Sequence, residues 1–408
     1  MKVENGNLIV NVYVETVAQP VNRAEVTVNQ TGEIYYTDES GKTNAIVLEA
    51  PSRSLSESPQ DNELPYAVYT IKVTKPGLNT AIIQDVQVFA GETSIQNVFL
   101  TASENAGGTT VQTIPEPTLW GDYPPINSEG EGNLSNDGTS VAVLPYVFIP
   151  EYIVVHDGNP SNTNAPNYRV NFPDYVKNVA SGEIYSTWPV ETIKANVYAI
   201  ISFALNRVYT EWYRSKGYNF DITSVTSYDQ KYSHGRTIFK SIADVVDEFF
   251  NTYITIGTRE NPYLAHYNDG VKLNNPGWLS QWGSKDLGDK GYDALRIIRY
   301  YYGQNANLNI TGTIEGSPTS FPGYNLNLGS CGADVQSIQI QLNTIRGNYP
   351  AIPVILGPDG RYGEDTKKTV EIFQKVFNLP VTGVVDFATW YKISYIYTAV
   401  ANLTKDTA

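Results

Sequence analysis

Apolar residues occupy alternate positions along the first hundred residues of the chain. The series from Leu8 to Val14 is the longest, and shorter series follow at 24–28 and 68–73. This period of two predicts β-strands that bury one face. Turn-forming runs at 38–41 and 75–77 separate the strands. The region is therefore predicted to form an all-β sandwich.

The period changes to that of α-helices further along the chain. Apolar residues spaced three and four apart predict a helix at Thr187-Trp188-Pro189, with Thr187 as its N-cap and Pro189 in its first turn. Further segments with helical spacing lie at 238–250, 293–302, 335–345 and 365–377. The central region mixes these helices with strand-like runs, whereas the last region is mostly helical.

Changes in composition mark the boundaries between regions. Two segments are too rich in Gly, Pro, Ser and Asn to bury much surface, and they are predicted to be linkers. The chain is multidomain: a β-sandwich at 1–100, a cleavable linker at 101–140, an α+β domain at 141–310, a second linker at 311–323 and a small α-helical domain at 324–402. A length of 408 residues suits several domains better than one.

The composition argues against several classes of function. Acidic residues outnumber basic ones by 42 to 28, giving a net charge of −14, so no nucleic-acid partner is expected. Cys331 is the only cysteine, so neither an intrachain disulfide nor a cysteine-based zinc site is expected. No apolar run suits a membrane span, and no signal peptide is readable at the start.

Three histidines remain as candidates for a metal site. His156, His234 and His266 could combine with Asp157 or Asp269. Their long separations in the sequence do not match the short ligand pairs of zinc sites, so structural roles are favoured. We expect neither a metal nor another cofactor.

The C-terminal region contains two similar turns, at 359–363 and 381–386. Glycine in each turn supplies the positive φ that the turn requires, and Thr366 and Thr389 are placed to cap the helices that follow. Together with Leu328–Val335, these residues closely resemble the peptidoglycan-binding type 1 domain.

That resemblance implies binding of peptidoglycan glycan strands or stem peptides. Arg361 and Tyr362, on the first turn, are the candidate contacts because they offer a fork-shaped donor and a stacking face. The alternative is that the turn residues serve the fold alone.

The central region contains two separated motifs. Glu183 lies just ahead of Trp188-Pro189, with Lys194-Ala195 in the first turn of the following helix. The second motif is Ser280-Gln281-Trp282-Gly283. In this order the motifs resemble the SpoIID/LytB domain. The resemblance implies that Glu183 is the catalytic residue.

One carboxyl group is enough to break a glycan strand when the sugar's own 6-hydroxyl attacks the anomeric carbon. Glu183 would then act as general acid and general base of a lytic transglycosylase, leaving 1,6-anhydromuramyl ends. A hydrolase would instead need a second carboxylate, for which Glu191, Asp229 and Asp269 are candidates. Apart from the resemblance, Glu183 reads as an acid that bonds to backbone amides at a helix start.

Polar and aromatic residues near these motifs are candidate sugar contacts, through stacking and hydrogen bonds. They are Tyr228, Asp229, Gln230, Tyr232, Gln281 and Trp282. Each is equally suited to a core or turn position.

Nearly the whole chain resembles spore cortex-lytic enzymes of the SleC type in their pre-pro-form, through its domain order and through Pro150–His156 and Tyr209–Tyr213. The resemblance implies a zymogen of the spore cortex or coat region. A subtilisin-like protease would activate it during germination by a cut before Val141, and we expect the removed region to cover the site. Asparagines replace the family's cysteines near 267–270 and 274–276, so a shared disulfide or metal site is not expected.

Two other functions fit the same sequence. A non-catalytic peptidoglycan-binding protein or amidase enhancer would tolerate replacement of Glu183 by Gln. A wall-degrading component of a phage-like system would keep the chemistry and change the location.

Overall fold

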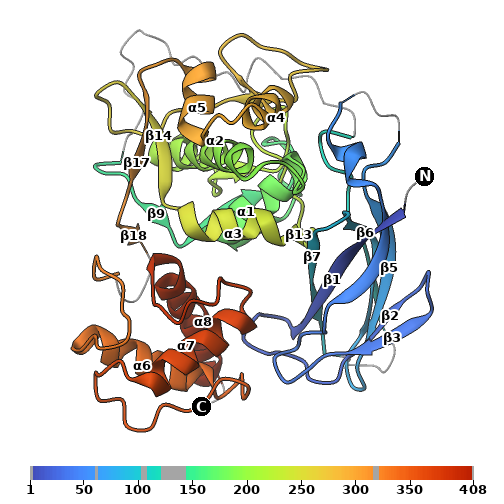
Figure 1. Ribbon diagram of the computed structural model, residues 1–408, viewed down its shortest axis with the longest axis vertical. Coiled ribbons are helices and arrows are strands. Elements are labelled where there is room, and N and C mark those ends of the chain that lie inside the picture. The colour runs from blue at the N-terminus through green and yellow to red at the C-terminus, as the bar shows by residue number, and fades with distance from the viewer. Residues whose placement is uncertain (1–2, 60–62, 103–107, 121–143, 316–320, 407–408) are drawn as a thin grey trace.

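The computed structural model describes residues 3–59, 63–102, 108–120, 144–315 and 321–406, which form three parts. A β-sandwich precedes a mixed α/β central part, and a helical part follows (Figure 1). Most of the predicted linker at 101–140, the predicted cut before Val141 and residues 316–320 of the second linker lie outside the described residues.

The N-terminal part consists of two sheets packed face to face. Its strands are β1 (Val3–Val14), β2 (Glu25–Val28), β3 (Glu33–Tyr36), β4 (Ile46–Pro51), β5 (Ala67–Thr74), β6 (Thr80–Val88), β7 (Thr93–Leu100) and β8 (Thr109–Thr113). One sheet has the order β13-β7-β1-β4 and the other β3-β2-β5-β6-β8. Alternate residues of the two sheets, such as Val10 and Ile71, form the core between them. The predicted period of two therefore identifies the buried face.

Two strands of this sandwich were not expected from the sequence. β8 lies in the predicted linker and pairs in parallel with β6. β13 (Ile238–Phe239) belongs to the central part, at the start of a predicted helix, and pairs with β7. Both predictions were wrong at these residues because the backbone groups bond to strands distant in the sequence.

The central part is built around one helix, α2 (Val190–Tyr209), which is buried along most of its length. It is surrounded by α1 (Phe172–Glu183), α3 (Lys240–Phe249), α4 (Gln281–Asp289) and α5 (Ala294–Tyr302), with the short strands β9 (Ile149–Pro150), β10 (Tyr152–His156), β11 (Asn167–Asn171), β12 (Ile222–Thr223), β14 (Thr252–Ile256), β15 (Tyr267–Asn268), β16 (Leu279–Ser280), β17 (Ala306–Ile310) and β18 (Ile314–Glu315).

The start of α2 differs from the prediction. Pro189, rather than Thr187, is the N-cap, and the Thr187 hydroxyl lies 2.6 Å from that of Ser56 in the β-sandwich. β18 pairs with β9, so residues 314–315 of the predicted second linker are part of a sheet. In both cases a contact between distant segments replaces the local role that the sequence indicated.

The C-terminal part contains α6 (Ala333–Ile345), α7 (Glu364–Val376) and α8 (Phe387–Asp406). The capping roles predicted for Thr366 and Thr389 were wrong. Their hydroxyls accept hydrogen bonds from the buried amides of Gln339 and Gln374, both at 3.1 Å. Each glutamine also accepts backbone N–H bonds from the turn before the next helix, so the two turns are fixed in the same way.

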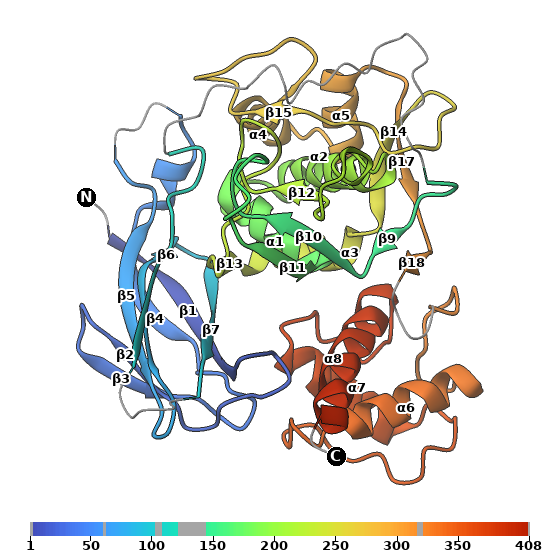
Figure 2. The ribbon, with the colours of Figure 1, turned by 180° about the vertical axis from the view of Figure 1, so that it is seen from behind.

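The three parts contact one another (Figures 1 and 2). Figure 2 shows β13 at the edge of the sandwich, beside β7. Phe89 of the sandwich packs edge-on against Phe239, with ring centroids 5.1 Å apart. The Asn348 side chain of the C-terminal part donates to the Ala18 carbonyl at 2.8 Å. The N-terminal part therefore contacts both other parts.

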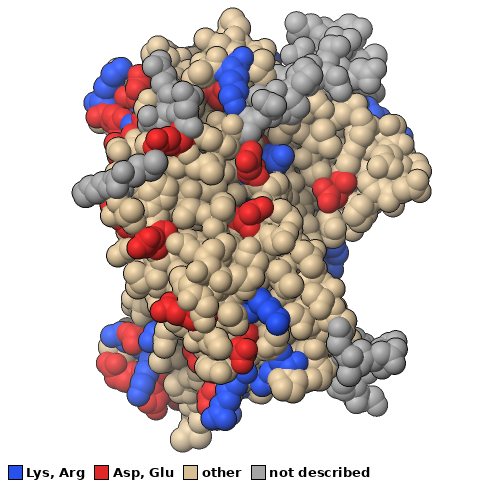
Figure 3. Space-filling view, turned by 90° about the vertical axis from the view of Figure 1, so that its right-hand side faces the viewer, with Lys and Arg blue, Asp and Glu red and all other residues tan. Residues whose placement is uncertain are grey.

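The surface seen from the sandwich side carries scattered charges of both signs (Figure 3). Lysine and arginine are interspersed with acidic residues on this face. Within the described ranges, no helix is long and apolar enough to cross a membrane.

Candidate functional site

Glu183 is the last residue of α1, and its side chain is buried between three segments. Only 1% of the residue is exposed. One carboxylate oxygen accepts a hydrogen bond from the backbone N–H of Lys231 at 3.1 Å, and the other accepts one from the Gln281 amide at 3.3 Å. These partners differ from the first-turn amides of α2 that the alternative interpretation required.

Burial raises the pKa of Glu183 above its ordinary value, because a charge in this interior loses its hydration. The hydrogen bonds from Lys231 and Gln281 oppose this effect but only in part. A raised pKa favours the protonated form of a carboxyl group, and that form can donate a proton. Burial therefore favours the protonated form of Glu183.

Two predicted motifs meet at this carboxyl group. Gln281 and Trp282 begin α4, whose N-cap Ser280 accepts a hydrogen bond from Gly283 N at 2.9 Å. Trp282 lies 5.0 Å from Trp188 between ring centroids, and both rings pack around Tyr185. The aromatic cluster fixes the start of α4 and so holds the Gln281 amide toward Glu183.

A segment of the N-terminal region lies directly against the site. The backbone N–H of Thr118 donates to the Gly182 carbonyl at 2.8 Å, one residue before Glu183. The Thr118 side chain is close enough to lower the pKa of Glu183. Ile114, Thr118 and Leu119 are buried. Residues 114–119 therefore cover the carboxyl group in the intact chain, although the sequence assigned them to a linker.

Arg236 is a site residue that the sequence analysis missed. Its guanidinium lies against Gly182, where a Cβ would be 3.1 Å from Cζ. One terminal nitrogen donates to Pro115 O at 3.0 Å and, over 3.4 Å, to Glu116 O. A lone arginine in a Gly-Arg-Thr turn gives no sequence signal, because only folding brings it to α1.

Asp229 and Gln230, predicted as sugar contacts, are part of the buried interior. The Asp229 carboxylate pairs with Arg207 at 2.8 Å, and neither side chain is more than 2% exposed. Gln230 accepts from Tyr175 OH at 2.9 Å and donates to Ile200 O at 3.2 Å. Because their polar atoms have protein partners, the structure gives both residues a structural role.

Tyr228 and Tyr232 lie in the same segment. The Tyr232 ring is buried and stacks on Tyr175, and its hydroxyl lies 3.2 Å from Nδ1 of His234. The hydroxyl of Tyr228 accepts a bond from Asn159 at 3.1 Å. Tyr228 is half-buried and retains some access to solvent.

The other candidate second carboxylates also have structural partners. Glu191 accepts from Lys194 and from Ala294 N, at 2.9 and 2.8 Å. Asp269 is buried and accepts backbone N–H bonds from the loop that follows it, including Leu273 N at 2.9 Å. Together with Asp229, these carboxylates organise loops and helix starts.

The three histidines lie in separate environments. His156 bonds to Asn167 at 2.7 Å, His234 stacks on Tyr168, and His266 stacks on Trp278. Burial lowers the pKa of His266 to about 4. Among the described residues, no group of three or more His, Cys, Asp or Glu side chains could hold a metal ion.

The predicted contacts of the C-terminal part have different exposures. Arg361 is exposed and bridges to Cys331 through its backbone. Tyr362 is only 2% exposed and donates its hydroxyl proton to Gly383 O at 2.9 Å. Its ring is therefore not exposed for stacking on a ligand at the surface, whereas Arg361 is exposed.

Residues 331–393 match the family model described as "Putative peptidoglycan binding domain". The chain carries a C-terminal peptidoglycan-binding domain. The domain indicates a protein associated with the cell wall, with peptidoglycan as a partner. The family model covers α6, α7 and the first part of α8.

Other comparisons add little. No curated protein matches the chain. One solved structure, a "putative membrane-associated protein of unknown function" from Bacteroides fragilis NCTC 9343, matches with 18% identity and a TM-score of 0.14. The match covers 31% of this chain and 34% of the other chain.

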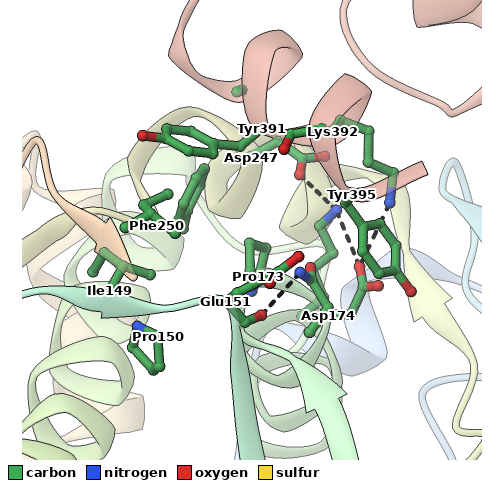
Figure 4. Close-up of a pocket in the computed structure, with 15 residues that line it drawn as sticks. Ile149, Pro150, Glu151, Pro173, Asp174, Asp247, Phe250, Tyr391, Lys392 and Tyr395 are labelled. Carbon is green, nitrogen blue, oxygen red and sulfur yellow. Dashed lines mark hydrogen bonds and ion pairs between the residues drawn. The ribbon is translucent and has the colours of Figure 1, made fainter. Parts of the chain in front are cut away.

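The peptidoglycan-binding domain docks on the central part through α8 (Figure 4). A cavity of about 30 Å³ at this junction is too small for a sugar. Beside it, Lys392 lies 3.9 Å from Asp174, and Lys177 pairs with Asp247 at 2.6 Å. The charged groups and the ring of Tyr391 form a contact between the parts (Figure 4).

Proposed function

We propose that the protein is a peptidoglycan lytic transglycosylase of the spore cortex. In this proposal Glu183 protonates the glycosidic oxygen and then accepts the proton of the sugar's 6-hydroxyl. The single observation that carries the proposal is the buried Glu183 carboxyl, which is held by Gln281 of the second motif and whose pKa is raised. The resemblance to SpoIID/LytB domains supports the same assignment.

A one-carboxyl mechanism fits the surroundings of Glu183 better than a paired-carboxylate hydrolase does. Glu191, Asp229 and Asp269 each bond to other protein groups. A hydrolase would need one of them to activate a water or to attack the sugar. The 6-hydroxyl of the substrate itself needs no second carboxylate.

We further propose that the intact chain is a zymogen. Residues 114–119 lie over Glu183, so a glycan strand has no access to the carboxyl group in this form. Cleavage in 121–143 by a subtilisin-like protease during germination would begin activation, and the peptidoglycan-binding domain would keep the enzyme on its substrate.

Mass spectrometry of fragments released from purified cortex tests the proposal. Three samples are compared. The first is the intact chain, and the second is the chain cut within 121–143 and then separated from its N-terminal piece. The third is the same cut product with Glu183→Gln. We expect 1,6-anhydromuramyl ends only from the activated chain with Glu183. Glu248→Gln, at an exposed acid on α3, is the matched control and should release the same products as the parent.

Other outcomes would redirect the assignment. Reducing ends would show hydrolysis and a second carboxylate. Binding to cortex without released fragments, unchanged by Glu183→Gln, would favour the amidase enhancer.

A further inference from the structure

The Arg236 guanidinium is buried beside Glu183 with part of its bonding capacity unused. The residue is only 2% exposed, and within the described part of the chain both Nε and one terminal nitrogen have no hydrogen-bond partner. A buried donor without a partner costs free energy, so native proteins rarely retain one without a reason. Among the described residues, the remaining terminal nitrogen bonds to carbonyls of the N-terminal segment, at Pro115 and Glu116.

The group remains a cation in this setting. Burial lowers the pKa of Arg236 to about 10, opposed by the nearby charge of Glu183. At neutral pH the guanidinium is therefore protonated and offers all its N–H groups. A planar guanidinium is suited to hold one or two carbonyl oxygens in a fixed orientation.

An open cleft lies on the other side of the covering segment. It has a volume of about 450 Å³ and is lined by Asp157, Tyr168, Ser224 and 231–234 of the central part and by 112–113 and Pro115 of the N-terminal segment. This volume is within the range of ligand sites.

Two residues connect the cleft to the buried site. Lys231 lines the cleft, and its backbone N–H bonds to Glu183. Pro115 lines the same cleft, and its carbonyl bonds to Arg236. Removal of Pro115 and its neighbours would therefore extend the cleft to both the guanidinium and the carboxyl group.

We propose that Arg236 is a substrate-binding residue that holds an amide carbonyl of the glycan beside the bond that Glu183 protonates. In the intact chain the carbonyls of Pro115 and Glu116 occupy its place. The chemistry of these occupants indicates the ligand, because a peptide carbonyl and a sugar acetamido carbonyl are the same kind of acceptor. This inference rests on the proposed function and adds a recognition group to it.

The assignment predicts an effect of Arg236→Ala in each of the two forms of the protein. In the intact chain, Arg236→Ala removes the bonds that hold 115–116, so hydrogen exchange of 113–120 should become faster. In a chain freed of this segment, the same substitution should weaken glycan binding. A purely structural arginine would instead give the same fold-loss of affinity for the acetylated and the de-N-acetylated sugar.

The experiment uses the full chain with Glu183→Gln, which prevents turnover, and engineered protease sites in 103–107 and 121–143. Cutting at both sites breaks the covalent links of the covering segment, which is paired with β6, and the segment is then separated from the chain in mild urea. Binding of tetra-N-acetylchitotetraose is measured by calorimetry before and after cutting. We expect binding after cutting, and roughly 10-fold or greater weakening by Arg236→Ala, since hydrogen bonds from a charged donor are lost.

Further arms identify the amide and guard against misfolding. If the acetamido group is the partner, the de-N-acetylated tetrasaccharide should bind weakly, with the same affinity whether residue 236 is arginine or alanine. A difference seen only with peptide-bearing muropeptides would assign the stem-peptide amide instead. Arg236→Lys keeps the charge without the fork and should bind at an intermediate level, whereas Arg259→Ala, at an exposed position, should bind like the parent.

Two results separate the inference from the proposed function. If the cut chain binds the sugar and Arg236→Ala and Arg236→Lys leave the affinity unchanged, Arg236 does not bind substrate and the proposed function survives. If the cut chain binds neither the oligosaccharide nor muropeptides, the proposed function fails and this inference fails with it.

Discussion

Asp229 offers a direct contrast between the sequence-based and structure-based assignments. The sequence suggested a sugar contact or a second carboxylate, whereas the structure shows a side chain with 0% exposure. It accepts bonds from Arg207 at 2.8 Å, from Tyr213 OH at 2.6 Å and from Thr223, both N and Oγ1, at 2.9 and 2.8 Å. Asp229→Ala removes this shared acceptor from the interior.

The expected cost follows from burial. Removal of one partner of a buried ion pair destabilises a protein by about 3–5 kcal/mol, because the other charge remains in the interior. Arg207 is only 2% exposed, so its charge has little access to water. We expect Asp229→Ala to lower the free energy of unfolding by about 4 kcal/mol.

A matched control comes from an exposed pair. Asp244 pairs with Lys240 at 2.7 Å within α3, and these side chains are 37% and 40% exposed. Exposed helix pairs contribute about 0.3–0.5 kcal/mol, and alanine favours the helix, so Asp244→Ala should change stability by less than about 0.5 kcal/mol.

Urea unfolding of the full chain, with hydrogen exchange of residues 200–210 as a local reporter, measures both variants. A stability loss below about 1 kcal/mol in Asp229→Ala would contradict the reasoning from burial. If glycan binding by the cut chain were then lost, Asp229 would be the ligand contact that the sequence suggested.

Three further predictions concern the site and the contacts between the parts. The folded chain binds the Glu183 proton more tightly than the unfolded chain does, because burial raises the pKa of this carboxyl group. The contribution of Glu183 to stability therefore falls as pH rises above the ordinary carboxyl pKa. Urea unfolding should show Glu183→Gln gaining stability relative to the parent between pH 4 and pH 7. Lys177→Met leaves the buried Asp247 carboxylate without its 2.6 Å partner and should cost about 3–5 kcal/mol in the same assay. After a cut within 121–143 alone, gel filtration in native buffer should find the N-terminal piece still bound, and late elution of a separate, smaller piece would contradict the contacts described.

The sequence predicted elements well where their signal is local. Asp293 is the N-cap of α5 and accepts from Arg296 N at 2.8 Å, so the helix predicted at 293–302 is confirmed within a residue. The strands of the sandwich likewise follow a period of two that arises from one buried face. These patterns arise from burial of one continuous face, so the spacing of apolar residues along the sequence is enough to predict them.

α8 had no clear signal in the sequence. Its residues are rich in tyrosine, isoleucine and threonine, which favour helices weakly. Packing on the central part stabilises it instead, for example through Tyr391 and Phe250, whose ring centroids are 6.4 Å apart. Helix propensity depends on local sequence, so it does not predict a helix that is stabilised by contacts with distant residues.

The site was predictable only in part for a similar reason. Glu183 and Gln281 are 98 positions apart, and a resemblance in motif order, rather than any local pattern, indicated that they belong to one site. Arg236 and the covering segment belong to no motif. Their positions depend on β13 joining β7 and on β8 joining β6, two pairings between strands far apart in the sequence.

These pairings bear on how the proposed zymogen would open. A cut within 121–143 breaks the chain and leaves the β13–β7 pairing, the bond from Gln96 to Gly235 O at 2.9 Å and the Phe89–Phe239 contact intact. The covering segment precedes the cut, so it remains attached to the sandwich. Cleavage would therefore remove only the covalent link that favours reclosure. A glycan that competes with Pro115 for the Arg236 guanidinium would then supply binding free energy for displacement, coupling activation to the presence of substrate.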